Sequence, residues 1–130
     1  RHAVVAVVNY GGKILIGKKR SDSPKFLAGK WHVPGENVEE KESDEEALIR
    51  GVREEAGIQI NVGRYLGNHI TPTSKKEAKW YECFATSDEA VPGSDLEEIL
   101  WIPRREVLNK CGLEVSRHWS KEILDYFNSP

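Results

Sequence analysis

One stretch decides the fold, and it runs from Trp31 to Ile58: WHVPGENVEEKESDEEALIRGVREEAGI. It contains a Pro-Gly turn, an acid-rich segment and a helical pattern that ends in Glu-Glu-Ala-Gly. The ring of Pro34 disfavours helix in the residue before it. We therefore expect a short extended piece at residues 31–33, an acidic loop from Gly35 to Glu42, and then a helix.

Both ends of this helix are marked in the sequence. Ser43 is followed three residues later by Glu46, the spacing of a capping box, in which each residue satisfies a free backbone N–H of the other. Gly57 can adopt the left-handed conformation that commonly ends a helix. These residues predict a helix over about 43–56.

The flanking segments predict strands on both sides of this helix and a second helix at the end of the chain. Two β-rich runs joined by Gly11-Gly12 predict a hairpin. The predicted strands are 2–10, 13–19, 58–68, 80–85 and 99–102, with helical turns at 104–110 and a terminal helix at about 116–128. Strands in a mixed order with two helices predict an α/β sandwich, in which a mixed sheet lies between helices.

Length and composition limit the class of protein. The 130 residues fit a single domain, 1–130. No apolar run approaches the roughly 20 residues that span a membrane, and no signal peptide is recognised, so we expect a cytoplasmic protein without a membrane partner. The formal net charge of −2 gives no indication of a nucleic-acid duplex as partner. We expect Cys83 and Cys111 to be buried reduced thiols, with a single disulfide as the alternative.

Acidic residues are concentrated in the helix and in the loop before it. Residues 36–55 contain nine Asp and Glu against three Lys and Arg, within a chain that is otherwise basic. Such an arrangement can bind a divalent cation together with a polyphosphate. The alternative is a solvated acidic helix face, which is the commoner role of such runs.

Two adjacent carboxylates at the end of the helix need a positive partner. Glu54 and Glu55 repel each other and oppose the helix dipole, which favours cations at this end. Arg50 lies four residues before Glu54, on the same helix face, and can compensate part of the charge. A hard divalent cation, Mg²⁺ or Mn²⁺, suits the remaining oxygen ligands, and a carbonyl of the Pro34-Gly35 turn can add another.

These residues resemble the Nudix box, G-x5-E-x7-R-E-U-x-E-E-x-G-U, which usually follows Pro-Gly. The chain aligns without gaps from Glu36 through Glu42 and Arg50 to Ile58. The upstream Trp-x-x-Pro-Gly and the downstream Glu-x-x-x-Trp at residues 97–101 also resemble the family, so the likeness covers most of the chain.

The resemblance implies a Nudix-type α/β/α sandwich and hydrolysis, dependent on Mg²⁺ or Mn²⁺, of a nucleoside diphosphate linked to another group, X. It implies Gly35, through its carbonyl, and Glu54 and Glu55 as metal ligands. It further implies that Arg50 orients the glutamates through charge-assisted hydrogen bonds. We expect Arg50, Glu54 and Glu55 to be the catalytic residues.

Two positions depart from the family pattern. Glu36 stands where the family has its first Gly, and Gly51 stands where it has the Glu that follows the Arg. Our hypothesis is a swap, in which Glu36 extends into the space vacated at Gly51 and restores a carboxylate as a metal ligand. The alternative is that Glu36 is a solvated loop residue and that the site is impaired.

Other site residues are predicted from their positions. The basic residues Lys18, Lys19 and Arg20 are near the family's position for substrate phosphates, although an exposed charged strand end is an equal alternative. Trp31 is a candidate for base stacking, as are Phe26 and Tyr81, although aromatic residues more often belong to the core.

We expect the proton acceptor of the reaction to be one of Asp95, Glu97 and Glu98. The four histidines, His2, His32, His69 and His118, show no spacing that indicates a site.

The preferred function is a MutT-like nucleoside triphosphate pyrophosphohydrolase, because the chain is short. ADP-ribose or a nucleotide sugar is the alternative substrate class. A degenerate Nudix domain that binds a nucleotide without hydrolysing it is the non-enzymatic alternative, and Gly51 favours it. Base specificity depends on loops outside the motif, and the sequence does not determine the oligomeric state.

Overall fold

Strand β1 (Ala3–Tyr10) is the strand on which the fold is built. The computed structural model describes residues 1–23 and 27–129 of the chain. Val5 and Val7 of β1 belong to one buried cluster, and Val4, Ala6 and Val8 belong to a second. Successive side chains of a strand point to opposite faces, so β1 separates two hydrophobic layers.

The sheet around β1 is mixed, as expected. Its order is β3 (Trp31–His32), β2 (Lys13–Lys19), β1, β6 (Glu77–Ala85) and β5 (Ile60–Ile70), with β4 (Gly35–Asn37) paired to β1 and β7 (Leu96–Pro103) paired to β2. The β1–β6 pair is parallel, and the other pairs are antiparallel. The predicted hairpin of the first two strands is confirmed.

Two different strands share one edge of β1. β2 pairs with its last residues, Asn9 and Tyr10, whereas β4 pairs with residues 3–5. β2 continues away from β1 and pairs with β7 instead. A cavity is lined by Val4 of β1, Gly17 of β2 and Gly35 of β4, at the place where β2 and β4 diverge.

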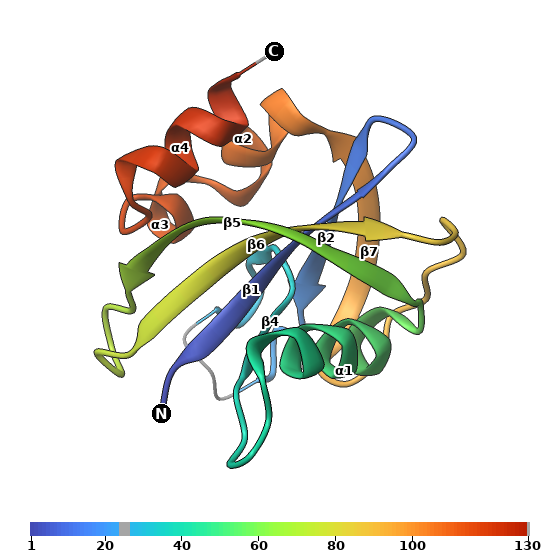
Figure 1. The fold of residues 1–130 in the computed structure, drawn as a ribbon. Coiled ribbons are helices and arrows are strands. Elements are labelled where there is room, and N and C mark those ends of the chain that lie inside the picture. Colours follow the sequence, from blue (N-terminus) through green and yellow to red (C-terminus); the bar gives the residue numbers. More distant parts are fainter. Residues whose placement is uncertain (24–26, 130) are drawn as a thin grey trace.

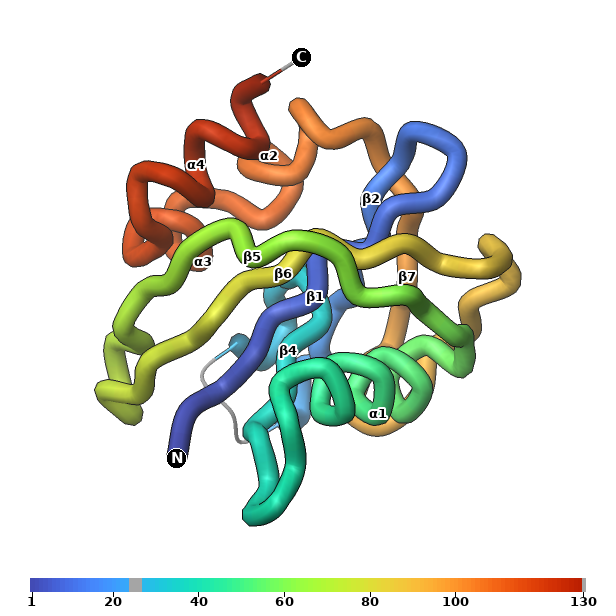
Figure 2. Tube along the Cα trace, viewed as in Figure 1, coloured from blue at the N-terminus to red at the C-terminus, as the bar shows by residue number. Residues whose placement is uncertain are grey.

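Helices cover both faces of the sheet, which confirms the α/β architecture (Figure 1). α1 (Asp44–Ala56) packs on the cluster that contains Val4. On the opposite face lie η1 (Arg104–Glu106), α2 (Val107–Cys111), α3 (Leu113–Ser116) and α4 (Lys121–Asn128). Figure 2 shows β4 passing between β1 and α1, so the loop before α1 is attached to the sheet.

The predicted caps of α1 are confirmed. Ser43 Oγ accepts a hydrogen bond from the backbone N–H of Glu46 at 3.1 Å, and Glu46 Oε1 accepts one from the N–H of Ser43 at 2.8 Å. Gly57 ends the helix with φ of 70°, in the left-handed region. The helix that carries the motif is therefore fixed at both ends by its own sequence.

The prediction of one continuous terminal helix from residue 116 is wrong. The chain leaves α3 after Ser116, and Ser120 is the N-cap of a separate α4. Both serines suit an N-cap, and a tertiary contact decides between them. Trp119 turns inward between the two helices and contacts the ring of Trp80, with centroids 4.7 Å apart.

Other predicted boundaries also need correction, and β5 covers Ile60–Ile70 instead of the predicted 58–68. Residues 35–37 form β4, although Gly-Glu-Asn has little strand propensity, because they find free backbone groups on β1. β6 and β7 each begin three residues earlier than expected, at Glu77 and Leu96, because hairpin and cross-strand pairing extends them.

Among the described residues, no helix is long and apolar enough to cross a membrane. Cys83 and Cys111 are buried free thiols.

Candidate active site

Arg50 holds the acidic loop against α1. Its guanidinium donates two hydrogen bonds to the carboxylate of Glu42, at 2.8 and 3.0 Å, and one to the carbonyl of Asn37 at 3.0 Å. It also donates to Glu54 Oε1 at 3.2 Å, which confirms the predicted compensation four residues along the helix. The hydrogen bonds from Arg50 lower the pKa of Glu42 to about 2. This bidentate pair fixes the loop that follows Glu36 of β4.

Glu36 occupies the space above Gly51. A Cβ placed on Gly51 would lie 2.9 Å from Cβ of Glu36 and 3.3 Å from its Cγ. Real Cβ atoms do not approach each other so closely, so a side chain at residue 51 is incompatible with the present position of Glu36. The Glu36 carboxylate lies 3.8 Å from that Cβ position and 3.4 Å from Nη1 of Arg50.

Glu55 is a buried acid with an incomplete set of partners. It is 6 % exposed, and its Oε1 has no hydrogen-bond partner among the described residues. Its Oε2 lies 3.8 Å from Nζ of Lys19, which also lies 3.6 Å from Oδ2 of Asp95. Burial is the largest cause that raises the pKa of Glu55 to about 7; Glu36 and Asp95 act in the same direction, whereas Lys19 and the backbone N–H of Gly35 oppose it.

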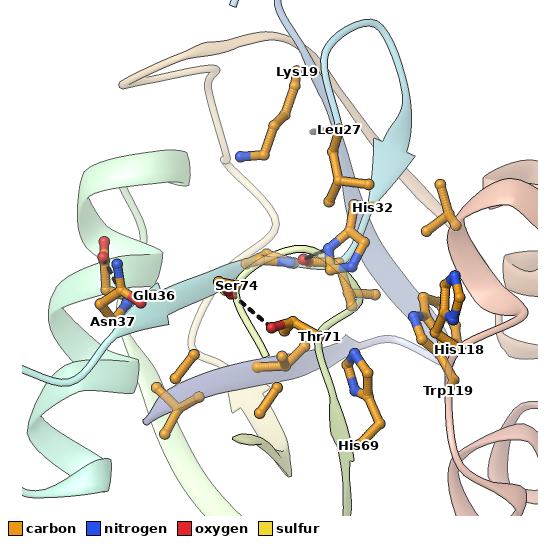
Figure 3. Close-up of a pocket in the computed structure, with 18 of the residues that line it drawn as sticks. Lys19, Leu27, His32, Glu36, Asn37, His69, Thr71, Ser74, His118 and Trp119 are labelled. Atoms are coloured by element: carbon orange, nitrogen blue, oxygen red, sulfur yellow. Dashed lines mark hydrogen bonds between the residues drawn. The ribbon is translucent and has the colours of Figure 1, made fainter. Parts of the chain in front are cut away.

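Glu36, Glu55 and Lys19 line one pocket of about 330 Å³, which is within the usual range for small-molecule sites. Lys19, Gly35, Glu36 and Glu55 lie at one end. In Figure 3, Glu36 lies on α1's side of the cavity and the labelled histidines lie on the other side, with Thr71 and Ser74 between them. The pocket therefore has an acidic end with one partly buried lysine and an aromatic, imidazole-rich end.

The structure places the remaining predicted residues outside this pocket. Glu54 is about half exposed and is held by Arg50. Lys18 pairs with Glu97 and Glu98, and Arg20 pairs with Asp22. Trp31 packs against the core below Lys110, and Tyr81 donates a hydrogen bond to Asp44. Phe26 lies outside the described residues. Of the three basic residues, only Lys19 lines the cavity, and of the three predicted proton acceptors, Asp95 is the one beside Lys19 and Glu55.

The expectation that the histidines show no constellation is wrong. His32 of β3, His69 of β5 and His118, which follows α3, all line the same pocket. Spacings of 37 and 49 residues carry no local pattern. The pairing of the strands and the packing of the helical segment on the sheet bring them together, so the sequence contains no local signal for this group.

The acidic end has the chemistry of a hard-cation site. All its candidate ligands are oxygens, from Glu36, Glu54, Glu55 and the Gly35 backbone, and such ligands suit Mg²⁺ and Mn²⁺. The buried Oε1 of Glu55, which has no hydrogen-bond partner among the described residues, is the observation that fits a cation site. In the described part of the chain, no three acidic, histidine or cysteine side chains already converge as a metal cluster. The residues therefore fit the ion in chemistry, and Glu54 must move from Arg50 to join the others.

The chain is similar in sequence to known proteins. The chain matches the family profile described as NUDIX domain over residues 1–126. It is 41% identical over 66 residues to the CTP pyrophosphohydrolase of Escherichia coli, covering 51% of this chain and 47% of that protein. It is 27% identical over 126 residues to the NAD-capped RNA hydrolase NudC of Pseudomonas fluorescens, covering 96% of this chain and 43% of that one.

The fold is also similar to that of solved structures. The crystal structure of the MutT protein from Methanosarcina mazei Go1 superposes with a TM-score of 0.71 at 23% identity, covering 96% of this chain and 88% of that one. The chain spans slightly less than half of the length of each of the two curated relatives above. A profile match over nearly the whole chain, on a mixed sheet with the motif helix in place, shows that the chain belongs to the Nudix family.

Proposed function

We propose that this chain is a pyrophosphohydrolase that uses Mg²⁺ or Mn²⁺ to cleave nucleoside diphosphates linked to a group X. Nucleoside triphosphates are the preferred class. The single observation that carries the proposal is the buried, incompletely partnered Glu55 beside Glu36 and Lys19 in a substrate-sized pocket. The relative named CTP pyrophosphohydrolase supports the triphosphate class. ADP-ribose and nucleotide sugars are the alternative class.

The metal ligands in this proposal are Glu36, Glu54 and Glu55 with the carbonyl of Gly35. When bound, a divalent cation would neutralise the charge that develops on the phosphate oxygens. Glu36 takes the part of the carboxylate that the family pattern has at residue 51, because its side chain fills the space that a side chain there would need. Arg50 is a positioning residue, since it contacts both Glu36 and Glu54.

Lys19 is the proposed phosphate-binding residue. Its ammonium lies between Glu55 and Asp95 at distances of 3.8 and 3.6 Å, longer than good hydrogen bonds. A phosphate oxygen that enters the pocket can therefore accept a hydrogen bond from it. Lys18 and Arg20 are weaker candidates for this role, because neither residue lines the pocket.

The reaction is the attack of a water oxygen on phosphorus with cleavage of the P–O bond of the anhydride. The water must lose a proton, and we propose Asp95 as its acceptor, since it is the acid that lies beside Lys19 and Glu55. Glu97 accepts a hydrogen bond from the N–H of Ser21, and Glu98 pairs with Lys18, so they are less suited to this role.

A release assay tests the proposal. CTP, ATP, ADP-ribose and UDP-glucose are incubated with the chain in Mg²⁺ or in EDTA, and released phosphate, pyrophosphate and nucleotide are measured. We expect Mg²⁺-dependent turnover of a triphosphate that falls about 100-fold or more in Glu55→Gln, a size typical of lost catalytic groups. Glu114→Gln, at an exposed ion pair with Lys30, is the matched control and should keep full activity. No turnover with retained nucleotide binding would replace the enzyme by a binding module.

A further inference from the structure

The imidazole-rich end of the pocket is a constructed surface that the chemistry at the acidic end does not use. His32 contacts Trp80 and Trp119, with ring centroids 6.4 and 5.8 Å away, and His69 contacts Trp80 at 5.8 Å. His32 and His69 face each other in Figure 3, with His118 and Trp119 beside them. Trp80 is fully buried, so it holds both rings from behind.

The position of the proton on His69 follows from its partner. Nε1–H of Trp80 donates a hydrogen bond to Nδ1 of His69 at 2.9 Å. The indole nitrogen can only donate, so Nδ1 of His69 carries no proton. Burial lowers the pKa of His69, which keeps the ring neutral at pH 7. Its one proton is therefore on Nε2, which is a hydrogen-bond donor.

The proton on His32 is fixed in the opposite sense. Its Nδ1 lies in hydrogen-bond contact with the carbonyl oxygen of Val33. A carbonyl can only accept, so Nδ1 carries the proton. Burial lowers the pKa of His32 to about 4, so the ring is neutral and its Nε2 is a hydrogen-bond acceptor. Within the described chain, no hydrogen bond engages Nε2 of either ring.

Two other occupants of this end fit less well. A metal ion would need a converging set of ligands, and in residues 1–23 and 27–129 no such set of three is present. A phosphate group would favour protonated imidazoles, whereas burial keeps His32 and His69 neutral. A neutral heterocycle with its own donor and acceptor matches both rings.

We infer that this end binds the nucleobase, with Nε2 of His32 accepting a hydrogen bond from the base and Nε2–H of His69 donating one to it. The inference rests on the proposed function, because the reaction at the acidic end fixes the phosphates near Lys19. The base is attached to these phosphates through its sugar and cannot reverse its orientation in the pocket. At the edge of an amino base, an exocyclic N–H donor lies next to a ring-nitrogen acceptor. At the edge of a keto base, a C=O acceptor lies at the first position and a ring N–H donor at the second. The fixed imidazoles therefore distinguish the two classes.

The test compares bases of equal size but reversed order: CTP with UTP, and ATP with ITP. We expect kcat/KM to differ by about tenfold or more within at least one pair, the size of one well-formed hydrogen bond. His69→Phe should reduce that ratio to less than about threefold, mainly through KM. The variant loses the hydrogen bond to the base, and with it the free-energy difference of about 1.4 kcal/mol that corresponds to a tenfold ratio. His69→Gln should keep it, since its amide can accept from Trp80 and donate to the base. His2→Gln, outside the pocket, is the control.

Two observations would overturn the inference while leaving the proposed function intact. One is hydrolysis of both members of each pair with kcat/KM values within about threefold. The other is a ¹⁵N spectrum of the ligand-free protein at pH 7.5 that shows a proton on Nε2 of His32 or on Nδ1 of His69. If no triphosphate is hydrolysed, this result contradicts the proposed function but leaves the inference about the base untouched. Titration with CMP, UMP, AMP and IMP then decides the inference, which requires that the His32 and His69 resonances shift with one member of a pair and not with the other.

Discussion

Glu36 and Gly51 show how two departures from a sequence pattern can be one feature. Either residue alone would be a defect: a glycine inside a helix costs about 1 kcal/mol relative to alanine, and a glutamate on β4, next to the acidic loop, places a charge among other acids. Together they share one volume, because Cβ of Glu36 lies where a side chain of residue 51 would begin. The sequence supports the pairing as a hypothesis, and the contact gives it a physical basis.

A stability cycle follows from this contact. Gly51→Ala in a Glu36→Gly background should stabilise the protein by about 1 kcal/mol, which is the helix propensity of alanine over glycine. In the wild-type background the new methyl group meets Glu36 at 2.9 Å, close to the backbone where little can move. The gain should vanish or reverse. Urea denaturation of the four proteins measures this coupling, and equal gains in both backgrounds would contradict the shared volume.

At the scale of elements, α1 was the part most open to prediction. Its capping box and its C-terminal glycine act through the backbone of the helix itself, so the sequence contains everything that fixes them. β4 and the break before α4 depend on partners elsewhere in the fold, on β1 and on Trp80. The site divides in the same way. The Arg50 contacts are local to the motif, whereas the His32–His69 pair depends on strand pairing.

The cap of α1 separates stability from activity. Ser43→Ala should destabilise the protein by about 1 kcal/mol, because the N–H of Glu46 loses its acceptor. Glu54 and Glu55 lie at the other end of the helix, so kcat under folding conditions should stay unchanged. Thermal unfolding and the release assay measure the two effects, with Ser43→Asp as the control that keeps an acceptor. A large fall in kcat for Ser43→Ala would show that the cap is coupled to the site.

At the scale of the whole molecule, His32 links folding to pH. Its pKa is about 4 in the folded state and about 6.5 when exposed, so the unfolded chain binds more protons between these values. Stability from this group is complete above pH 6.5 and is lost as the pH falls toward 4. We expect a loss on the order of 1–2 kcal/mol between pH 7.5 and 5.

A variant isolates this contribution. Glu55 acts in the opposite sense, because its raised pKa makes the folded state bind more protons below pH 7. His32→Gln removes only the imidazole, so its free energy of unfolding should fall less than that of the wild type over the same range. Urea denaturation at both pH values measures the difference. Parallel changes in the two proteins would mean that the ring is not held neutral.

In the proposed site, Glu36 supplies the carboxylate that Gly51 lacks. The most direct test is the reciprocal swap, in which Mg²⁺-dependent turnover is measured for Glu36→Gly, Gly51→Glu and the double variant. Each single variant should lose about 100-fold or more in kcat, the first because a ligand is missing and the second because two side chains collide. The double variant should recover to within about tenfold of wild type, because a lost ligand and its replacement share one site. A double variant as inactive as Glu36→Gly, or a Glu36→Gly variant with full activity, would contradict the claim.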